Sequence, residues 1–191
     1  MTLRRVTPPA TDPITLEEAK DQCEVDYPDR DDYITRLIKT AVSFVDGEGI
    51  LGRAMVSQTW AQWVGQSPGV VRITMGPFID LTGVSYYDTD GALQVANAAD
   101  FEVRLDGDFV NVRPKNGKAW PAAQSRDDAI KIEFTAGYGT AADVPDNIKH
   151  ALLLMVGHWF KEREAASELS LKDIPMGVDA LIGVERVGWY G

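Results

Sequence analysis

Three small residues at a phosphate-binding spacing are the most chemically suggestive feature of the sequence. Gly137, Gly139 and Ala142 fit the pattern G-x-G-x-x-A, in which a glycine turn brings backbone amides close to a pyrophosphate. That use requires a second strand after the following helix, and the sequence beyond Gly139 offers one long helix and no clear returning strand. The helix also begins late, at Pro145, so its N-terminal amides lie outside the glycine turn. We therefore interpret Gly137, Gly139 and Pro145 as a structural turn and predict no bound cofactor. An enzyme that uses the Gly137–Gly139 turn is the alternative.

Two further short motifs imitate functional sites. Residues 65–69 (GQSPG) fit the G-x-S-x-G of serine hydrolases, but a nucleophilic serine sits between a strand and a helix, and here the strand-like VVRIT follows. We interpret the segment around Ser67 as a hairpin loop. Residues 88–92 (DTDGA) resemble part of a calcium loop, yet the glycine and the final glutamate that such a loop needs are not in place. A hairpin turn is the favoured interpretation, and no catalytic residue is predicted.

No set of residues has the spacing of a metal site. The acidic run Asp26, Asp29, Asp31 and Asp32 precedes a predicted helix, where carboxylates complement the helix dipole. His150 and His158, eight residues apart on one predicted helix, point in different directions, and Cys23 is the single cysteine. We expect these acidic residues to cap or solvate the helix, and we predict no metal.

The composition limits the classes of partner. The chain has 191 residues and a net charge of -10, so its average surface does not favour the phosphate backbone of nucleic acids. No apolar run approaches the roughly 20 residues of a membrane-spanning helix, and no membrane partner is expected. The N-terminal segment lacks the apolar region of a signal peptide.

Hydrophobic periodicity divides the chain into three parts. Residues 14–53 and 144–191 are predicted to form a helical body, and residues 54–140 a central antiparallel β insertion, within one domain of residues 1–191. Thr15 and Glu18 form a predicted capping box for the first helix. Asp90-Gly91 and Asp106-Gly107 are hairpin signals within the insertion. The predicted fold class is α+β: two N-terminal helices, a long apolar helix, a short C-terminal helix and the β insertion. The second helix has an apolar stripe made of Ile34, Leu37, Ile38, Ala41 and Val45.

The C-terminal third carries the candidate interface. The helix after Pro145 is so apolar that we expect it at the centre of the helical body, or against another subunit. Its one polar stripe is predicted to consist of Asp146, His150, Gly157, Lys161 and Glu164. A short helix is predicted over Val178–Ile182, followed by an apolar tail that would fray unless docked. The residues of this candidate interface, which would dock on a neighbouring subunit or another partner, are Val184, Val187, Trp189 and Tyr190. The alternative is that the tail folds back on its own subunit.

The order of several motifs along the chain resembles the phage head–tail connector family, also called adaptor or head-completion proteins. The similar segments are ITLEEAK at 14–20, GRA at 52–54, QTW at 58–60, TAGYG at 135–139 with a Val-Pro and a Leu-rich helix after it, and IPMGVDALIGVERVGW at 174–189. They cover nearly the full length in the expected order, while the central strands are hard to align.

This resemblance implies a structural protein without enzymatic activity. The implied assembly is a homo-oligomeric ring, usually of twelve copies, under the portal protein of a tailed phage or of a particle such as a gene transfer agent. A stopper or tail terminator protein would dock on the tail side, and DNA would pass through the lumen without sequence-specific binding. The implied location is the neck of a virion assembled in the bacterial cytoplasm. A tail-completion or stopper protein of the same neck is the alternative. The acidic composition and the five tryptophans suit a DNA channel and protein interfaces.

Overall fold

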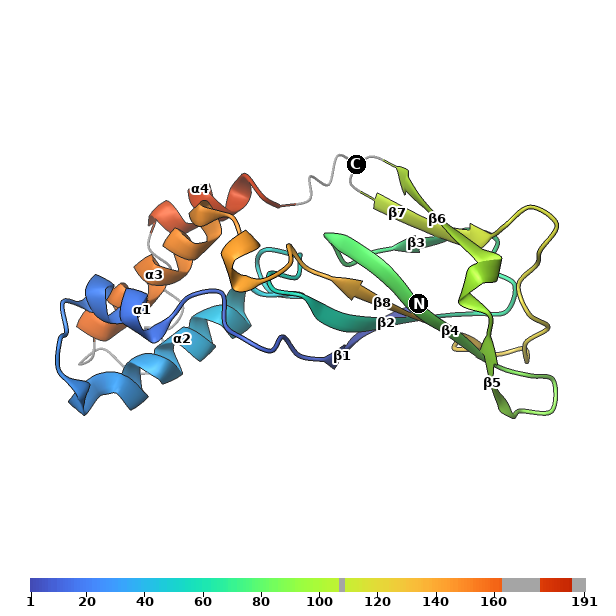
Figure 1. Ribbon diagram of the computed structural model, residues 1–191, viewed down its shortest axis with the longest axis horizontal. Coiled ribbons are helices and arrows are strands. Elements are labelled where there is room, and N and C mark those ends of the chain that lie inside the picture. Colours follow the sequence, from blue (N-terminus) through green and yellow to red (C-terminus); the bar gives the residue numbers. More distant parts are fainter. Residues whose placement is uncertain (107–108, 163–175, 187–191) are drawn as a thin grey trace. The chain divides into compact units, whose positions relative to one another are not determined.

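The computed structural model describes residues 1–106, 109–162 and 176–186 of the chain (Figure 1). The chain folds into two compact units. We call Met1–Pro9 with Ser57–Gly137 the sheet unit, and Ala10–Val56 with Tyr138–Gly191 the helical unit. Among the described residues the fold class is as predicted, a mixture of helices and antiparallel sheet. The sheet unit lies close to the expected β insertion and adds the first nine residues to it.

The sheet unit consists of two antiparallel sheets. The order of strands is β1-β2-β8-β4-β5 in the first sheet and β3-β7-β6 in the second. A 3-10 helix, η2 (Ala98–Asp100), connects β5 to β6. Both predicted hairpins are present, β4 with β5 and β6 with β7, and Gly91 has the positive φ of 83° that the first turn requires. The strands are β1 (Thr2–Thr7), β2 (Gln58–Val64), β3 (Val71–Ile73), β4 (Phe78–Tyr87), β5 (Leu93–Ala96), β6 (Phe101–Asp106), β7 (Phe109–Pro114) and β8 (Ile130–Ala136).

Alternating side chains give each sheet one buried face. In β8, Ile130, Ile132 and Phe134 are buried, whereas the residues between them are partly exposed. Gln62 of β2 points to the same buried side, where its Nε2 donates to the carbonyl oxygen of Arg72 in β3 at 2.8 Å. The two sheets therefore pack with their apolar faces toward each other, and Gln62 links them.

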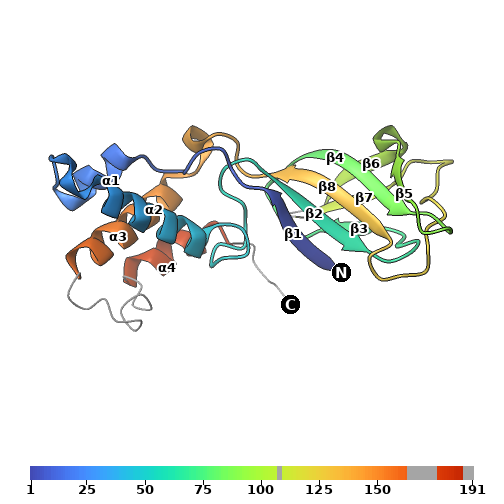
Figure 2. The same cartoon turned by 90° about the horizontal axis from the view of Figure 1, so that it is seen from below.

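The helical unit packs its helices around α3. Its helices are α1 (Leu16–Cys23), α2 (Asp31–Val45), α3 (Asp146–Lys161) and α4 (Met176–Gly183), with the 3-10 helices η1 (Pro28–Arg30) and η3 (Ala141–Asp143). Helix α3 contacts α1, α2 and α4, as expected for a helix at the centre of the helical body (Figures 1 and 2). It is not apolar throughout, because Asp146, His150 and Lys161 are exposed. The predicted capping box is present, since Thr15 Oγ1 accepts from the Glu18 amide and Glu18 Oε2 from the Thr15 amide. The whole predicted stripe of α2 is buried: Ile34, Leu37, Ile38, Ala41 and Val45.

The predicted polar stripe of α3 is partly wrong. Gly157 is buried, and a Cβ there would lie 3.2 Å from Cγ of Gln22. Glycine at this position lets α1 approach α3 closely, so the residue serves packing rather than solvation. Leu153 and Leu154 are only partly buried, so apolar side chains also reach the surface of this helix. Glu164 lies outside the described residues.

Two further expectations about the chain's organisation need correction. Residues 65–69 are not a hairpin loop, because β2 pairs with β1 and β8 while β3 pairs with β7 in the other sheet. Tryptophan is also not reserved for interfaces, since Trp60 and Trp159 are 2% and 6% exposed and belong to the cores of the two units.

Candidate functional site

The glycine turn is held by backbone hydrogen bonds on both of its sides. The amide of Gly137 donates to the carbonyl of Pro77, and the amide of Tyr138 donates to the carbonyl of Met55, each at 2.8 Å. Gly137 and Gly139 have φ values of 139° and 130°, which residues other than glycine rarely adopt. By these hydrogen bonds, Gly137 is held within the sheet unit and Tyr138 within the helical unit. Pro145 is the N-cap of α3, one residue before the first helical position.

A carboxylate of the protein itself occupies this turn. Asp143 Oδ2 accepts hydrogen bonds from the amide of Thr140 at 2.7 Å and from its hydroxyl at 2.6 Å. These hydrogen bonds lower the pKa of Asp143, the side-chain bond more than the backbone bond. The amide and hydroxyl of Thr140 are thus engaged with a carboxylate, and the amides of Gly137 and Tyr138 are engaged with carbonyl oxygens. The 3-10 helix η3 also separates the turn from the amides of α3, where a phosphate would be bound. The arrangement supports a structural role for the turn.

The other two chemically suggestive motifs, DTDGA and GQSPG, form a turn and a loop. Asp88 Oδ1 accepts from the amides of Asp90 and Ala92, and Asp88 Oδ2 accepts from Nε2 of Gln94 at 2.8 Å, so the turn supplies its own donors to this carboxylate. The hydrogen bond from Gln94 is the main cause that lowers the pKa of Asp88. Ser67 is exposed, with a φ of 52°, and lies in the sheet unit, whereas both histidines belong to the helical unit.

The acidic run before α2 forms an ion pair instead of a side-chain cap. The N-cap of α2 is Arg30, and no side chain caps its amides. Asp31 accepts from Nζ of Lys20 in α1 at 2.6 Å, while Asp31 and Asp32 lie in the first turn, where the helix dipole favours them. Within the described residues, no group of three or more His, Cys, Asp or Glu side chains could hold a metal ion. None of the helices in this part of the chain could span a membrane.

The C-terminal segment is fastened to its own unit directly after α4. Tyr138 Oη donates to Glu185 Oε2 at 3.0 Å, and Nε of Arg186 donates to the carbonyl of Ile50 at 2.8 Å. Burial first, and then the hydrogen bond to Glu185, raise the pKa of Tyr138 to about 12. Between these anchors and α4, Val184 is 77% exposed.

Val187, Trp189 and Tyr190 lie outside the described residues. Their docking on another chain therefore remains a prediction.

One long surface segment of the sheet unit is unusually apolar. Residues 93–106 run through β5, η2 and β6, so the same segment forms an edge strand of both sheets (Figure 1). Four of its apolar side chains are exposed, and we call this segment the apolar edge. The exposed fractions are 63% for Leu93, 82% for Val95, 37% for Val103 and 81% for Leu105.

A family model covers most of the sequence. The model described as "HCP: Head completion protein" matches residues 13–171. The chain belongs to the head completion protein family. This confirms the family resemblance that the motifs indicated.

Solved structures share the fold over almost the whole length of this head completion protein. A chain from "Neck of empty GTA particle computed with C6 symmetry" has a TM-score of 0.74 and 19% identity, and the match covers 98% of this chain and 96% of that one. Chains from "Virion of native gene transfer agent (GTA) particle" and "Neck of native GTA particle computed with C12 symmetry" have TM-scores of 0.71 and 0.68 at 18% identity, with the same coverage. A search of curated proteins found no match.

The sequence motifs of this head completion protein did not indicate the exposed edges of the sheet unit. The strand β1 was not anticipated, although the β-branched Thr2, Val6 and Thr7 gave a weak signal for it. The exposure of Val95 and Leu105 was not visible either, because an alternating apolar pattern is the same whether its face is buried or open.

Proposed function

We propose that this head completion protein is a structural component of the neck of a tailed phage or phage-like particle, where it joins the head to the tail. The observation that carries the proposal is the whole-chain similarity to chains from gene transfer agent particles, two of them described as necks, with a TM-score of 0.74 for the first. A match over 98% of this chain includes both units, so the comparison does not depend on one common subdomain.

Copies of the chain form a ring in this proposal. The similar chains come from necks computed with C6 and C12 symmetry, which supports a closed cyclic assembly, and twelve copies agree with the second symmetry. The portal protein would contact one side of the ring, and a stopper or tail terminator protein would contact the other.

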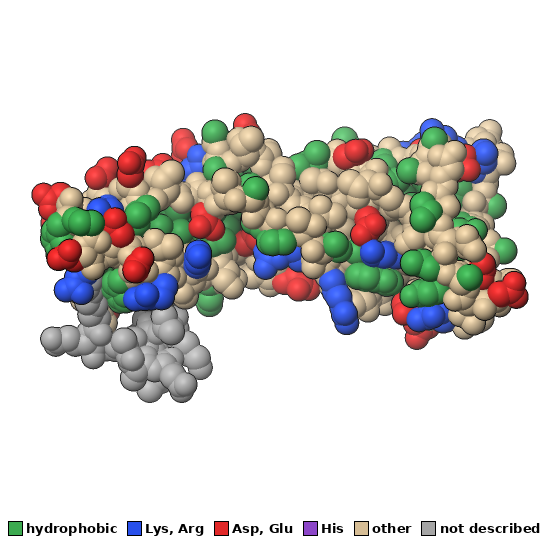
Figure 3. Space-filling model, turned by 60° about the horizontal axis from the view of Figure 1, so that its bottom comes forward, with side chains coloured by type: hydrophobic (Ala, Val, Ile, Leu, Met, Phe, Trp, Pro, Cys, Tyr) green, Lys and Arg blue, Asp and Glu red, His purple; other side chains and the backbone are tan. Residues whose placement is uncertain are grey.

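The charge of the chain suits a passage for DNA. The net charge is -10, and acidic and basic side chains are interspersed on the face drawn in Figure 3, without an extended basic area. Few phosphate contacts would form on such a surface, so DNA would pass without being held. The proposed role requires no catalysis, and the three motifs that suggested chemistry are turns or loops in the structure.

A stopper in the same neck is the second candidate. The observation in its favour is the large sheet unit, which holds all eight strands of the described part of the chain. An adaptor would contact the portal protein directly, whereas a stopper would need the adaptor ring to be present.

Deletion of the gene, with electron microscopy of the particles, tests the proposed function. We expect DNA-filled or empty heads and separate tails, with joined particles restored when the intact gene is supplied. A normal yield of tailed, infectious or gene-transferring particles without the protein would refute a neck role. Pull-down with purified portal protein then separates the two candidates, because only an adaptor should bind portal protein alone.

A further inference from the structure

We propose that neighbouring copies of this chain join through the sheet unit, with the β1 edge of one copy docked on the apolar edge of the next. The inference rests on the proposed ring and goes further by naming the surfaces that meet. A ring requires two different surfaces on each copy, one for each neighbour. The two open ends of the five-stranded sheet are such a pair.

The apolar edge has the composition of a covered surface. Leu93 and Val95 alternate along β5 and therefore share one face, paired with Tyr87 and Ser85 of β4. Val103 and Leu105 of β6 lie opposite Val112 and Val110 of β7, which are 0% and 6% exposed. Leu105 thus continues a buried row of the three-stranded sheet into solvent. Side chains of this kind in contact with water favour association with another chain.

Both edges also present unpaired backbone. Within the described residues, β5 pairs only with β4, β6 only with β7, and β1 only with β2. Free strand edges accept strands from other chains unless the sequence protects them. The apolar edge carries little such protection over β5, where Leu93, Gln94, Val95 and Ala96 are uncharged. β1 and β5 are the two end strands of the five-stranded sheet, with β2, β8 and β4 between them, so these two edges lie on opposite sides of that sheet.

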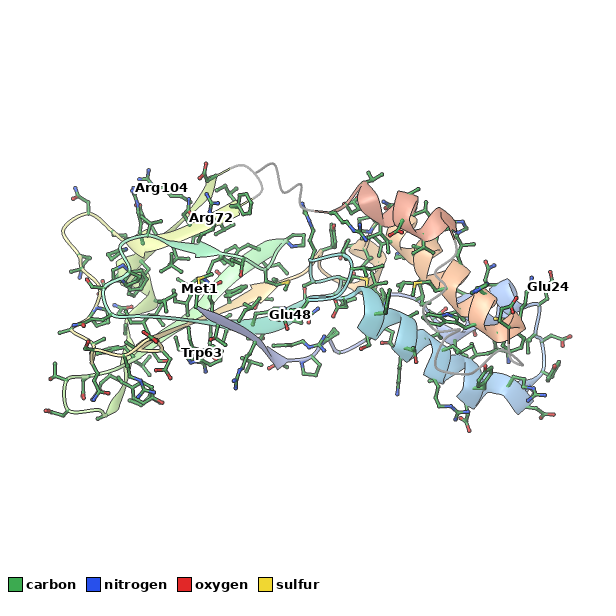
Figure 4. All side chains as sticks on the ribbon, turned by 180° about the vertical axis from the view of Figure 1, so that it is seen from behind. Met1, Glu24, Glu48, Trp63, Arg72 and Arg104 are labelled. Carbon is green, nitrogen blue, oxygen red and sulfur yellow. The ribbon has the colours of Figure 1, made fainter. Side chains whose placement is uncertain are left out.

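The charges of the two edges have opposite signs. β1 carries Arg4 and Arg5 and no acidic residue, and both arginines are exposed together with Val6. Residues 88–106 contain five acidic residues and one cation, Arg104, which is labelled on β6 in Figure 4.

Part of this acidic charge is compensated within the chain. Asp100 pairs with Lys118, Glu102 pairs with Arg104 and Arg113, and Asp106 lies 3.9 Å from Arg72. Among the described residues, Asp88 and Asp90, in the turn before β5, form no ion pair, and they provide the negative charge that attracts a basic edge. Opposite charges of this kind favour docking of β1 from another copy over docking of a second apolar edge.

Two interface variants and two controls test the proposal in sedimentation velocity over a series of protein concentrations. Val95→Lys with Leu105→Lys alters the apolar edge, and Arg4→Glu with Val6→Glu alters the β1 edge. All four side chains are exposed, so both proteins should fold. Tyr27→Lys and Lys39→Glu, at exposed positions of the helical unit, are matched controls for the lost apolar group and the reversed charge.

We expect the wild-type chain and the controls to form oligomers, and each interface variant to lose association by about 10-fold or more per apolar side chain removed. The two variants mixed in equal amounts should form a dimer and nothing larger, because each supplies the edge that the other lacks. Oligomers of either variant alone, equal in size and affinity to those of the wild type, would overturn the proposal.

A cross-link within particles separates this proposal from the neck role. Arg4→Cys and Val95→Cys are introduced together, and a bis-maleimide is added to purified particles; the native Cys23 is buried. A ladder of covalent multimers supports the edge-to-edge contact, with single-cysteine chains as controls. Particles that contain the protein but give no multimers would overturn the contact and leave the neck role intact. Absence of the protein from particles would refute the neck role itself.

Discussion

Replacing Gly139 by alanine tests whether the glycine turn is structural and filled by the protein's own carboxylate. A residue with a side chain at a φ of 130° costs on the order of 1–3 kcal/mol. The new Cβ would lie 2.6 Å from Oδ2 of Asp143 and 3.2 Å from its Cγ, so the aspartate would have to leave the turn. The hydrogen bonds to Thr140 would then be lost, at a cost of about 0.5–2 kcal/mol, as for other capping side chains. The expected loss of stability is about 2–4 kcal/mol.

Urea unfolding, followed by circular dichroism, measures this loss. Gly52→Ala is the matched control, since Gly52 has a φ of 67° in the same unit but nothing within 4 Å of a Cβ. It should cost only the backbone term of about 1–2 kcal/mol. Asp143→Ala removes the clashing carboxylate, so Gly139→Ala should cost less in that background than in the wild type. Equal losses for Gly139→Ala and Gly52→Ala, or protection of the wild type by a nucleotide, would refute the structural reading of the turn.

Three further predictions concern titration, metal and the C-terminal segment. The folded-state pKa of Tyr138, about 12, exceeds its ordinary value of 10.0, so the stability that depends on its neutral form is complete below pH 10 and is lost as the pH rises from 10 to 12. Tyr138→Phe should lose about 1 kcal/mol or less at pH 8 and show a shallower decline over that range; an identical pH profile would contradict the partly buried hydrogen bond to Glu185. A chelator should leave the melting temperature unchanged, and a lower melting temperature would indicate a metal bound at Asp26–Asp32. A chain that ends at Arg186 keeps the hydrogen bonds of Glu185 and Arg186, and it should melt cooperatively yet fail to join portal-containing particles. A chain that ends at Gly183 should also lose stability. Normal assembly of the chain that ends at Arg186 would refute the docking prediction.

Helices and hairpins could be predicted because their signals are local. The capping box of Thr15 and Glu18, the stripe that begins at Ile34 and the turn at Asp90-Gly91 each depend on residues a few positions apart. The short helix predicted over 178–182 is contained in α4, Met176–Gly183, for the same reason.

The features that the sequence did not reveal depend on distant partners. β2 does not form a hairpin with β3, because it pairs with β1 and β8, and the chain continues from β2 into the second sheet. These two partner strands lie far from β2 in sequence. Burial of Gly157 follows from the approach of Gln22 on another helix. The tail can be proposed as an interface from its aromatic residues alone, and that proposal stays a prediction. The apolar edge can be proposed only when it is known which strands lie at the ends of each sheet.

The most direct measurement of the central claim is a cryo-electron microscopy map of particle necks that carry this protein with an added C-terminal density label. The account predicts label density in a ring at the junction of head and tail, with cyclic symmetry, and none elsewhere on the particle. Label on the capsid shell or along the tail tube, or particles without label from cells that produce the protein, would contradict it.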